Sequence, residues 1–273
     1  MAHSDLKTAT AFANSWNNLP RGAIYTKEQY IDWMCPLIKN DIAGKNILEL
    51  GCGNGSLMVH TLSWGPDHIH GIDLGDSVYS ARNNLVDTGC ENWSVGQDDL
   101  VDFASSGFDV VYCIGVLHHL DKPSSGFSSV IRNTKRGGKF HCWVYAKEGN
   151  QLVIAFVEPM RRVTALLPWR LTKYVISAPL ALVFFCHTKA SLLLIPSVIF
   201  DRLPLSEYCR WISARGYRFF WHVVFDQLVA PKTQYISYES IRNWINSEPR
   251  INQHTTYIHK RNGNSWKFGG TVE

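Results

Sequence analysis

An apolar segment that runs directly into three closely spaced glycines constrains the fold of this chain more than any other feature of its sequence. Asn46-Ile-Leu-Glu-Leu50 has the length and composition of a buried strand, and Gly51, Gly53 and Gly55 follow it. Glycines there let backbone N–H groups and the next helix N-terminus approach a ligand closely. Eighteen residues beyond Gly55, a second apolar segment ends in Asp73, placed where acids accept hydrogen bonds from ribose hydroxyls. The pattern predicts a site for a nucleoside-containing cofactor.

Short apolar runs alternate with stretches of helical period between about residues 44 and 146. We expect strands at 46–50, 68–73, 108–114 and 139–145, and helices at 77–86 and 124–133. Strands that alternate with helices form βαβ units, in which a parallel sheet is covered on both faces. The fold class is therefore α/β, with a doubly wound sheet.

Beyond residue 150 this alternation stops. Residues 151–215 form apolar helical stretches separated by prolines, so we expect a helical insertion that covers the substrate site. A helix is then expected at 238–246, and strands at 255–260 and 265–268 form an antiparallel hairpin through an Asn-Gly turn. The predicted organisation is N-terminal helices over the cofactor site at 1–43, a core at 44–150, the insertion at 151–215, and an active-site connection, helix and hairpin at 216–273.

The composition is that of a folded protein from a reducing compartment. Of its 273 residues 45% are hydrophobic and 18% are charged, which excludes a disordered chain. The seven cysteines are widely spread without a C-x-x-C pair, which argues against a disulfide framework. The polar N-terminus lacks a signal-peptide pattern, and Pro179, His187-Thr-Lys189 and Pro196 interrupt the most apolar stretch. We expect a cytoplasmic protein without a transmembrane helix.

Details of the glycine loop distinguish between cofactors. The dinucleotide fingerprint requires a glycine at the position that Ser56 occupies here. Glu49, two residues before the first glycine, would repel a pyrophosphate, whereas it favours a cofactor with a cationic ammonium or sulfonium group. The loop therefore favours S-adenosyl-L-methionine (SAM) over NAD.

The segment Glu49-Leu-Gly-Cys-Gly-Asn-Gly55 resembles the first motif of class I SAM-dependent methyltransferases, and later motifs follow in the same order. The matching segments are Gly71-Ile-Asp73 with Ser77, Gly96-Gln-Asp-Asp-Leu100, Phe108 to Leu120, and Arg136-Gly-Gly138. The likeness spans residues 44–146 and is greatest for the ubiquinone-type, small-molecule branch, in which Val116-Leu-His-His-Leu120 is a familiar run. It implies a Rossmann-like, mostly parallel seven-stranded sheet and SAM as the cofactor.

The resemblance also implies a cofactor-binding set by position. Its members are Glu49, Gly51, Cys52, Gly53, Gly55, Asp73, Leu74, Asp98 or its neighbour Asp99, Ile114 and Gly115. Within this set the glycines would pack against the methionine part and Glu49 would lie near its amino group. Asp73 would bind the ribose, Leu74 would flank the adenine, and Asp98 or Asp99 would face the adenine amine.

Methyl transfer is an in-line displacement that needs an aligned nucleophile and, for a hydroxyl acceptor, a base. His118 and His119 are candidates for that base or for a substrate contact; alternatively, one caps the next helix and the other is exposed. His222, Asp226 and Tyr235 are further candidates, with a turn cap and core packing as their alternative roles. No metal is expected, because no third ligand of suitable spacing accompanies the histidine pair.

The insertion is basic as well as apolar. Residues 151–220 carry nine Lys and Arg against three acids, a net charge of 9 − 3 = +6. This balance favours an anionic or lipid-linked acceptor, contacted by Arg161 and Arg162. The apolar segments have three alternative roles: a lid over the acceptor, peripheral contact with the inner membrane face, or an oligomer interface.

We therefore expect a cytoplasmic SAM-dependent methyltransferase that O-methylates a sugar, a glycan precursor or a secondary metabolite, without a nucleic-acid partner. The alternative reaction is C-methylation of a lipid-soluble ring compound. Two rival classes remain, an NAD(P)-dependent oxidoreductase and a non-catalytic SAM-binding or membrane-docking protein.

Overall fold

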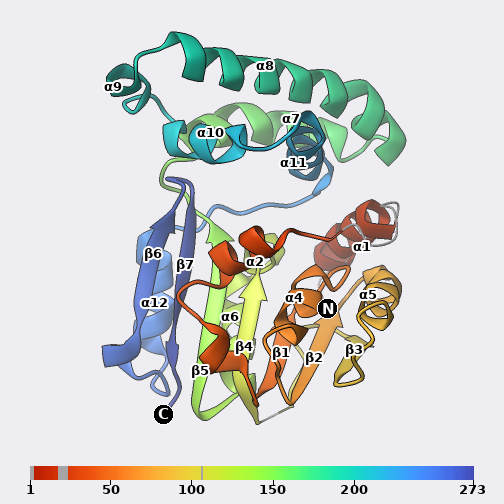
Figure 1. Cartoon of the computed structure of the whole chain (residues 1–273), viewed down its shortest axis with the longest axis vertical. Coiled ribbons are helices and arrows are strands. Elements are labelled where there is room, and N and C mark those ends of the chain that lie inside the picture. The colour runs from red at the N-terminus through yellow and green to blue at the C-terminus, as the bar shows by residue number, and fades with distance from the viewer. Residues whose placement is uncertain (1–2, 18–23, 106) are drawn as a thin grey trace.

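A seven-stranded sheet forms the centre of the computed structural model, which describes residues 3–17, 24–105 and 107–273 (Figure 1). The strand order is β3-β2-β1-β4-β5-β7-β6; β1 to β5 are parallel and β7 pairs antiparallel with both β5 and β6. The strands are β1 (Asn46–Leu50), β2 (His68–Asp73), β3 (Trp93–Gln97), β4 (Phe108–Ile114), β5 (Thr134–Tyr145), β6 (Tyr257–Arg261) and β7 (Ser265–Thr271). The predicted doubly wound α/β fold is confirmed.

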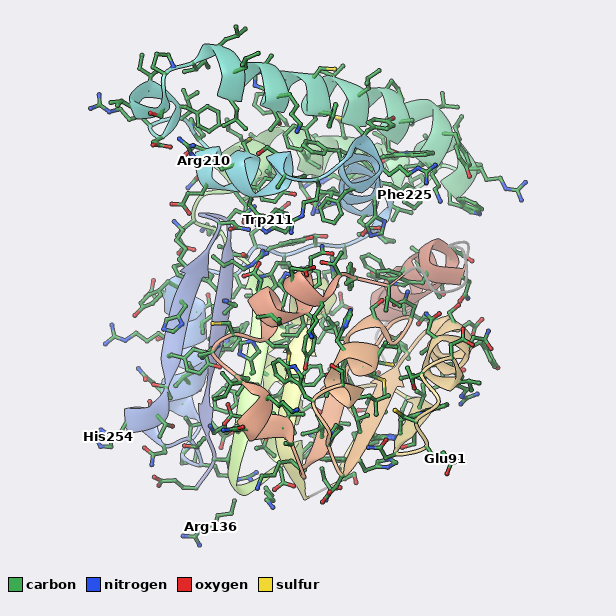
Figure 2. All side chains as sticks on the ribbon, in the orientation of Figure 1. Glu91, Arg136, Arg210, Trp211, Phe225 and His254 are labelled. Atoms are coloured by element: carbon green, nitrogen blue, oxygen red, sulfur yellow. The ribbon has the colours of Figure 1, made fainter. Side chains whose placement is uncertain are left out.

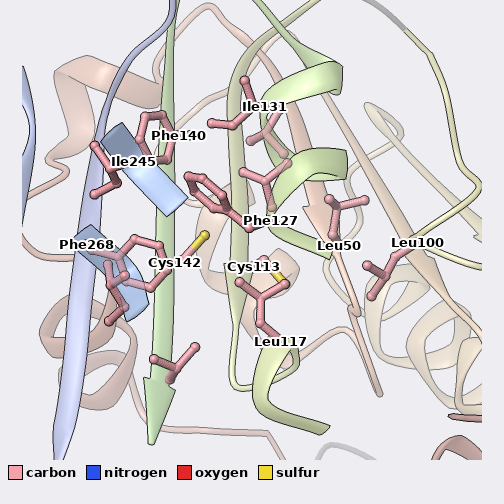
Figure 3. Packing of buried hydrophobic residues seen from close by; sticks show 14 of the residues in the cluster. Leu50, Leu100, Cys113, Leu117, Phe127, Ile131, Phe140, Cys142, Ile245 and Phe268 are labelled. Atoms are coloured by element: carbon pink, nitrogen blue, oxygen red, sulfur yellow. The ribbon is translucent and has the colours of Figure 1, made fainter. Parts of the chain in front are cut away.

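Consecutive residues of the central strands pack on opposite faces of this sheet. In β4, Val110 and Tyr112 belong to one apolar cluster, whereas Val111 and Cys113 belong to the other. The first cluster lies beneath α2 (Lys27–Met34), α3 (Lys39–Ile42) and α4 (Ser56–Leu62); the second lies beneath α6 (Pro123–Asn133) and α12 (Tyr238–Ser247) (Figure 3). The remaining core helices are α1 (His3–Asn17), α5 (Ser77–Val86), η1 (Leu117–His119) and η4 (Gln253–Thr255). Continuous apolar strands therefore build a sheet covered on both sides.

A second helical layer, which we call the cap, lies across the end of the sheet to which the parallel strands point (Figure 1). It consists of η2 (Val153–Val157), α7 (Glu158–Thr164), η3 (Leu171–Ser177), α8 (Ala178–Leu194), α9 (Ser197–Phe200), α10 (Ser206–Ser213) and α11 (Tyr217–Val229). Its own apolar cluster is centred on Ala181, Ile212 and Phe220. Because Phe220 lies on α11, the cap extends past the predicted boundary at residue 215.

The most apolar stretch of the cap is interrupted at Pro196, as predicted, but it continues as a helix through Pro179 and residues 187–189, contrary to the prediction. The π-helix η3 passes directly into α8, so that Pro179 falls in the first turn of the α-helix, where a missing N–H is tolerated. His187 and Lys189 lie within the same helix. Leu171–Leu194 is long and apolar enough to cross a membrane by length and composition, so the expectation that no segment of this length exists is wrong.

Candidate active site

The glycine loop after β1 adopts a backbone that other residues rarely adopt. Gly51, Gly53 and Gly55 have φ of 81°, 53° and 73°, in the left-handed region. A Cβ on Gly51 would lie 2.4 Å from one methyl carbon of Val116 and 2.9 Å from the other, closer than van der Waals contact allows. Gly51 and Gly53 line the cavity described below, whereas Gly55 lies outside its lining and packs closely against Ala81 of α5.

Asp73, at the end of β2, holds this loop in place. One of its carboxylate oxygens accepts a hydrogen bond from Gly53 N at 2.9 Å, and the other accepts from Gly75 N at 2.9 Å and Ser77 Oγ at 3.0 Å. Burial raises the pKa of this carboxyl, and the hydrogen bonds oppose that rise. A carboxylate has about four acceptor sites, so one remains for a ligand hydroxyl.

Glu49 presents a second buried carboxylate beside the loop. Tyr112 donates a hydrogen bond to it at 2.9 Å, and Thr61 connects Tyr112 to Tyr30 at 3.0 and 3.1 Å. Burial, and then the nearby Asp73, raise the pKa of Glu49 well above its usual range. A carboxylate this desolvated has a strong preference for a cationic partner.

The structure separates the two adjacent acids after β3. Asp99 is buried and lines the cavity, and its carboxylate accepts a hydrogen bond from Val101 N at 2.9 Å. Asp98 is exposed and its carboxylate accepts from Asp99 N, so it is not placed to face a cofactor. Cys52, Leu74, Ile114 and Gly115 also line the cavity.

One cavity of about 590 Å³ joins the carboxyl end of the sheet to the cap. Core residues form its floor, among them Glu49, Asp73 and Gly115, and cap residues such as Phe184 and Trp211 form its roof. Trp16 of α1 connects the two halves. Its indole nitrogen lies 3.5 Å from the point where a side chain on Gly53 would place its Cβ. Its ring centroid lies 5.8 Å from the ring centroid of His222 on α11. We call the part of the cavity that lies beneath the cap the chamber.

Two of the predicted catalytic residues form a pair on α11. His222 Nε2 lies 3.2 Å from Asp226 Oδ2, and both side chains line the cavity. The spacing of four residues places them on one face of the helix, while Phe220 packs on the opposite side against Phe184 and Phe185 of α8. The pair is therefore held over the chamber by the packing of the cap.

Tyr235 lines the same cavity, near a hydrogen-bonded relay that joins the cap to β5. Gln227 Nε2 donates to the Tyr145 hydroxyl at 2.9 Å, and the Arg161 guanidinium donates to Gln227 Oε1 at 2.7 Å and to Glu158 at 2.6 Å. Arg161 is 1% exposed, and its hydrogen bonds to Gln227 join α7 to α11. The prediction that Arg161 contacts an anionic acceptor is not supported; Arg162 is exposed.

The two histidines after β4 have different environments. His119 lines the cavity, donates from Nδ1 to the Lys232 carbonyl at 2.8 Å, and has its pKa lowered to about 4 by burial. His118 is fully buried outside the cavity lining, with its ring 4.3 Å from that of Tyr145, and burial lowers its pKa well below the usual range. A lowered pKa makes each imidazole a weak proton acceptor, so neither is well suited to act as the base.

Comparisons with known proteins find similarity in the part of the chain that forms the cavity floor. A methyltransferase domain model matches residues 48–140. The chain is 31% identical over 112 residues to the ubiquinone biosynthesis O-methyltransferase of Dechloromonas aromatica, and 29% over 122 residues to the tRNA U34 carboxymethyltransferase of Pseudomonas paraeruginosa. The chain contains a class I SAM-dependent methyltransferase domain.

Structural similarity to solved SAM-dependent methyltransferases covers more of this chain than sequence similarity does. The magnesium protoporphyrin IX methyltransferase of Synechocystis, solved with S-adenosylhomocysteine, has a TM-score of 0.52 at 13% identity over 90% of this chain and 82% of its own. An O-methyltransferase family protein of Burkholderia thailandensis has a TM-score of 0.54 at 12% identity, covering 90% and 56%. The match to the ubiquinone biosynthesis O-methyltransferase covers 40% of this chain and 47% of that relative. The match to the tRNA U34 carboxymethyltransferase covers 43% of this chain and 38% of that relative.

The floor of the methyltransferase domain fits the parts of SAM. The buried Glu49 suits a cationic amino group, Asp73 suits the ribose, and Asp99 lies on the same floor for the adenine. Aromatic rings of Trp16, Tyr25 and other cavity residues surround the loop, and ring faces attract a sulfonium cation. Sequence reasoning placed Trp16 in a helix but missed its position beside the cofactor loop.

Proposed function

We propose that this protein transfers a methyl group from SAM to a hydroxyl group on an apolar, ring-containing small molecule. The observation that carries the proposal is the His222–Asp226 pair, which faces the same cavity as the cofactor floor. A hydroxyl acceptor needs a base, and a carboxylate-oriented imidazole is a common one.

The chamber walls favour an apolar acceptor over a sugar. Side chains that line the chamber include Leu152, Val153, Val157, Met160, Leu180, Phe184, Leu205, Phe219 and Val223. Polar side chains of the same cavity include His222, Asp226, Gln227, Tyr145, Tyr235, Asn150, Asn264 and Arg261. Most of the lining is nevertheless apolar, whereas a sugar presents hydroxyls on most of its surface. A ring with one or a few hydroxyls matches this distribution.

The roles of the residues follow from their placement. Bound SAM supplies an electrophilic methyl group. The chamber walls exclude water and orient the acceptor. His222 would take the proton of the acceptor hydroxyl as the acceptor oxygen bonds to the methyl carbon, while the methyl–sulfur bond breaks and S-adenosylhomocysteine leaves. Since Nε2 faces Asp226, we assign the proton-accepting role to Nδ1, with the Asp226 carboxylate stabilising the imidazolium that forms.

The similarity to ubiquinone biosynthesis O-methyltransferases supports oxygen as the acceptor atom. The same part of the chain also matches tRNA U34 carboxymethyltransferases, so the nucleic-acid alternative belongs in the test. The alternative reaction, C-methylation of a ring, would use the same cofactor-binding floor. The position of the methyl group in the product distinguishes O-methylation from C-methylation.

The experiment is a transfer assay with ¹³C-methyl SAM, purified full-length protein and a panel of phenols, catechols and apolar alcohols, beside simple sugars and bulk tRNA. We expect label in a methoxy group of an apolar hydroxylated ring, recognised by its ¹³C chemical shift. Label on a ring carbon, on a sugar or on tRNA would overturn the proposal. Binding of S-adenosylhomocysteine without turnover on any acceptor would favour the non-catalytic alternative.

A further inference from the structure

Exposed large apolar side chains are concentrated on the cap. Of the 22 described large hydrophobic residues that are exposed, 16 lie between Leu152 and Leu203. Soluble surfaces seldom carry so many apolar side chains together, and such patches mark interaction sites. Leu152, Met160 and Leu180 of this set line the chamber, and the other 13 lie outside its lining.

The helix α8 carries the clearest part of this patch. It is the cap helix farthest from the sheet in Figure 1. Apolar and small exposed residues recur at helical spacing on one side of it, and they are Leu182, Val183, Cys186, Ala190, Leu193 and Leu194, with His187 and Lys189 also exposed. Ala181, Thr188 and Ser191, on the opposite side, are buried. We call the exposed side of α8, with Val198 and Ile199 of α9, the outer face.

The chain segment that carries the outer face is basic, and the acids at its two ends, Glu158 and Asp201, are paired with Arg161 and Arg210. Residues 159–200 contain five basic residues, Arg161, Arg162, Arg170, Lys173 and Lys189, and no Asp or Glu. Arg162, Arg170 and Lys189 are exposed. The guanidinium of Arg170 lies 5.5 Å from the ring centroid of Trp169, and Tyr174 is 54% exposed. Basic residues and aromatic rings beside an apolar face are typical of helices that lie in a membrane interface.

We propose that the outer face docks on the surface of a bilayer that contains anionic lipids, with α8 lying in the plane of the interface. A position across the bilayer would pull α8 away from α11, where Phe184 and Phe185 pack on Phe220 at 5.1 and 5.2 Å between centroids. A second copy of the chain would present the same positive charge, whereas an anionic surface complements it.

Vesicle flotation of the full-length protein tests this docking without any assay of methyl transfer. We expect the protein to float with vesicles of phosphatidylcholine and phosphatidylglycerol at low salt, and at least tenfold less with phosphatidylcholine alone or in 0.5 M salt. The variant Val183→Glu/Leu194→Glu should bind at least tenfold more weakly. The matched variant Tyr79→Glu/Val86→Glu, at exposed positions of α5, should bind like the wild type.

A second measurement reports on α8 itself. In a variant with Cys35→Ser and Cys90→Ser, Cys186 is the remaining exposed cysteine and accepts a polarity-sensitive fluorophore. We expect a blue shift on addition of anionic vesicles. Absence of binding by folded wild-type protein, equal binding by the Val183→Glu/Leu194→Glu variant, or a dimer in sedimentation velocity that this variant abolishes would each overturn the proposal.

Discussion

His222 Nε2 lies 3.2 Å from Asp226 Oδ2, one turn apart on a helix that belongs to the cap rather than to the cofactor-binding core. The ring of Trp16 lies between this pair and the glycine loop, 5.8 Å from the imidazole centroid. The proposed base and the cofactor floor are therefore supplied by different layers of the molecule, and their alignment depends on how the cap sits on the sheet.

Replacing His222 by Asn should lower kcat by about 10² to 10⁴, the usual contribution of a general base. Asp226→Asn should lower kcat less, because the imidazole remains but loses its orienting carboxylate. Binding of S-adenosylhomocysteine, measured by calorimetry, should stay within about twofold of wild type. His254→Asn, at an exposed position far from the cap, is the control (Figure 2). Full activity in His222→Asn would eliminate this residue as the base.

Asp73→Asn should weaken binding of S-adenosylhomocysteine by about 10- to 100-fold. The change removes a charged acceptor that also fixes Gly53 and Gly75, and hydrogen bonds to charged groups contribute about 1.5–3 kcal/mol each. Calorimetric titration measures the effect. Asp99→Asn should weaken binding and Asp98→Asn should not, since only Asp99 lines the cavity. The reverse order would show that the adenine-side acid is Asp98.

Cofactor binding should release a proton through Glu49. Its pKa is raised by burial in the free protein, and a bound ammonium group favours the ionised form and lowers that pKa. Affinity for S-adenosylhomocysteine should therefore increase with pH until the pKa of the free protein is passed, and then level off. Calorimetry at pH 6 in two buffers of different ionisation enthalpy counts the proton. Glu49→Gln should bind more weakly and release none; an unchanged proton count would rule out Glu49 as its source.

Acid should destabilise the fold through three histidines, the buried His118 and His141 and the half-buried His119. Burial lowers the pKa of His119 and His141 to about 4 and that of His118 well below its usual range, whereas unfolded histidine titrates near about 6.5. The stabilisation is complete above the unfolded pKa and is lost as pH falls towards 4. Each histidine changes the free energy of unfolding by up to about 1.4 kcal/mol per pH unit, and the three together by up to about 4 kcal/mol per pH unit. Urea unfolding between pH 7 and 5 measures the slope; a free energy of unfolding that does not change would contradict this account.

The adjacent arginines of α7 should respond differently to substitution. Arg161→Ala leaves Glu158 and Gln227 without their partner inside the protein and should cost about 3 kcal/mol of unfolding free energy. Arg162→Ala, at an exposed position, should change it by less than about 0.5 kcal/mol. Chemical denaturation of both variants distinguishes them, and equal effects would contradict the assigned relay.

The core of the fold could be predicted from sequence because its signals are local. The strand 46–50, the glycines after it and Asp73 each follow from a few neighbouring residues, and β1, β2 and β4 begin and end where predicted. Asp98 and Asp99 could not be distinguished in this way, because adjacent side chains after a strand point in different directions and the turn decides which faces inward.

The cap was harder to predict because its arrangement depends on distant contacts. Pro179 suggested a helix end, yet the π-helical register of η3 brings it into a first helical turn. The partners of Arg161 on α11 are 66 residues away, so a basic residue that seemed available for an acceptor is occupied. No sequence motif marks Tyr145 or Gln227 as site residues. Only their positions, at the end of a strand and next to Asp226, could have indicated that they contribute to the site.

The separate apolar cluster of the cap has a consequence for how this protein can change. Ala181, Ile212 and Phe220 form a cluster whose other hydrophobic members are cap residues, so the roof of the chamber has an apolar core of its own. Substitutions on the inner side of the roof can then reshape the acceptor pocket without disturbing Glu49, Asp73 or the glycine loop. One cofactor-binding domain can in this way serve different acceptors as the residues of the roof change.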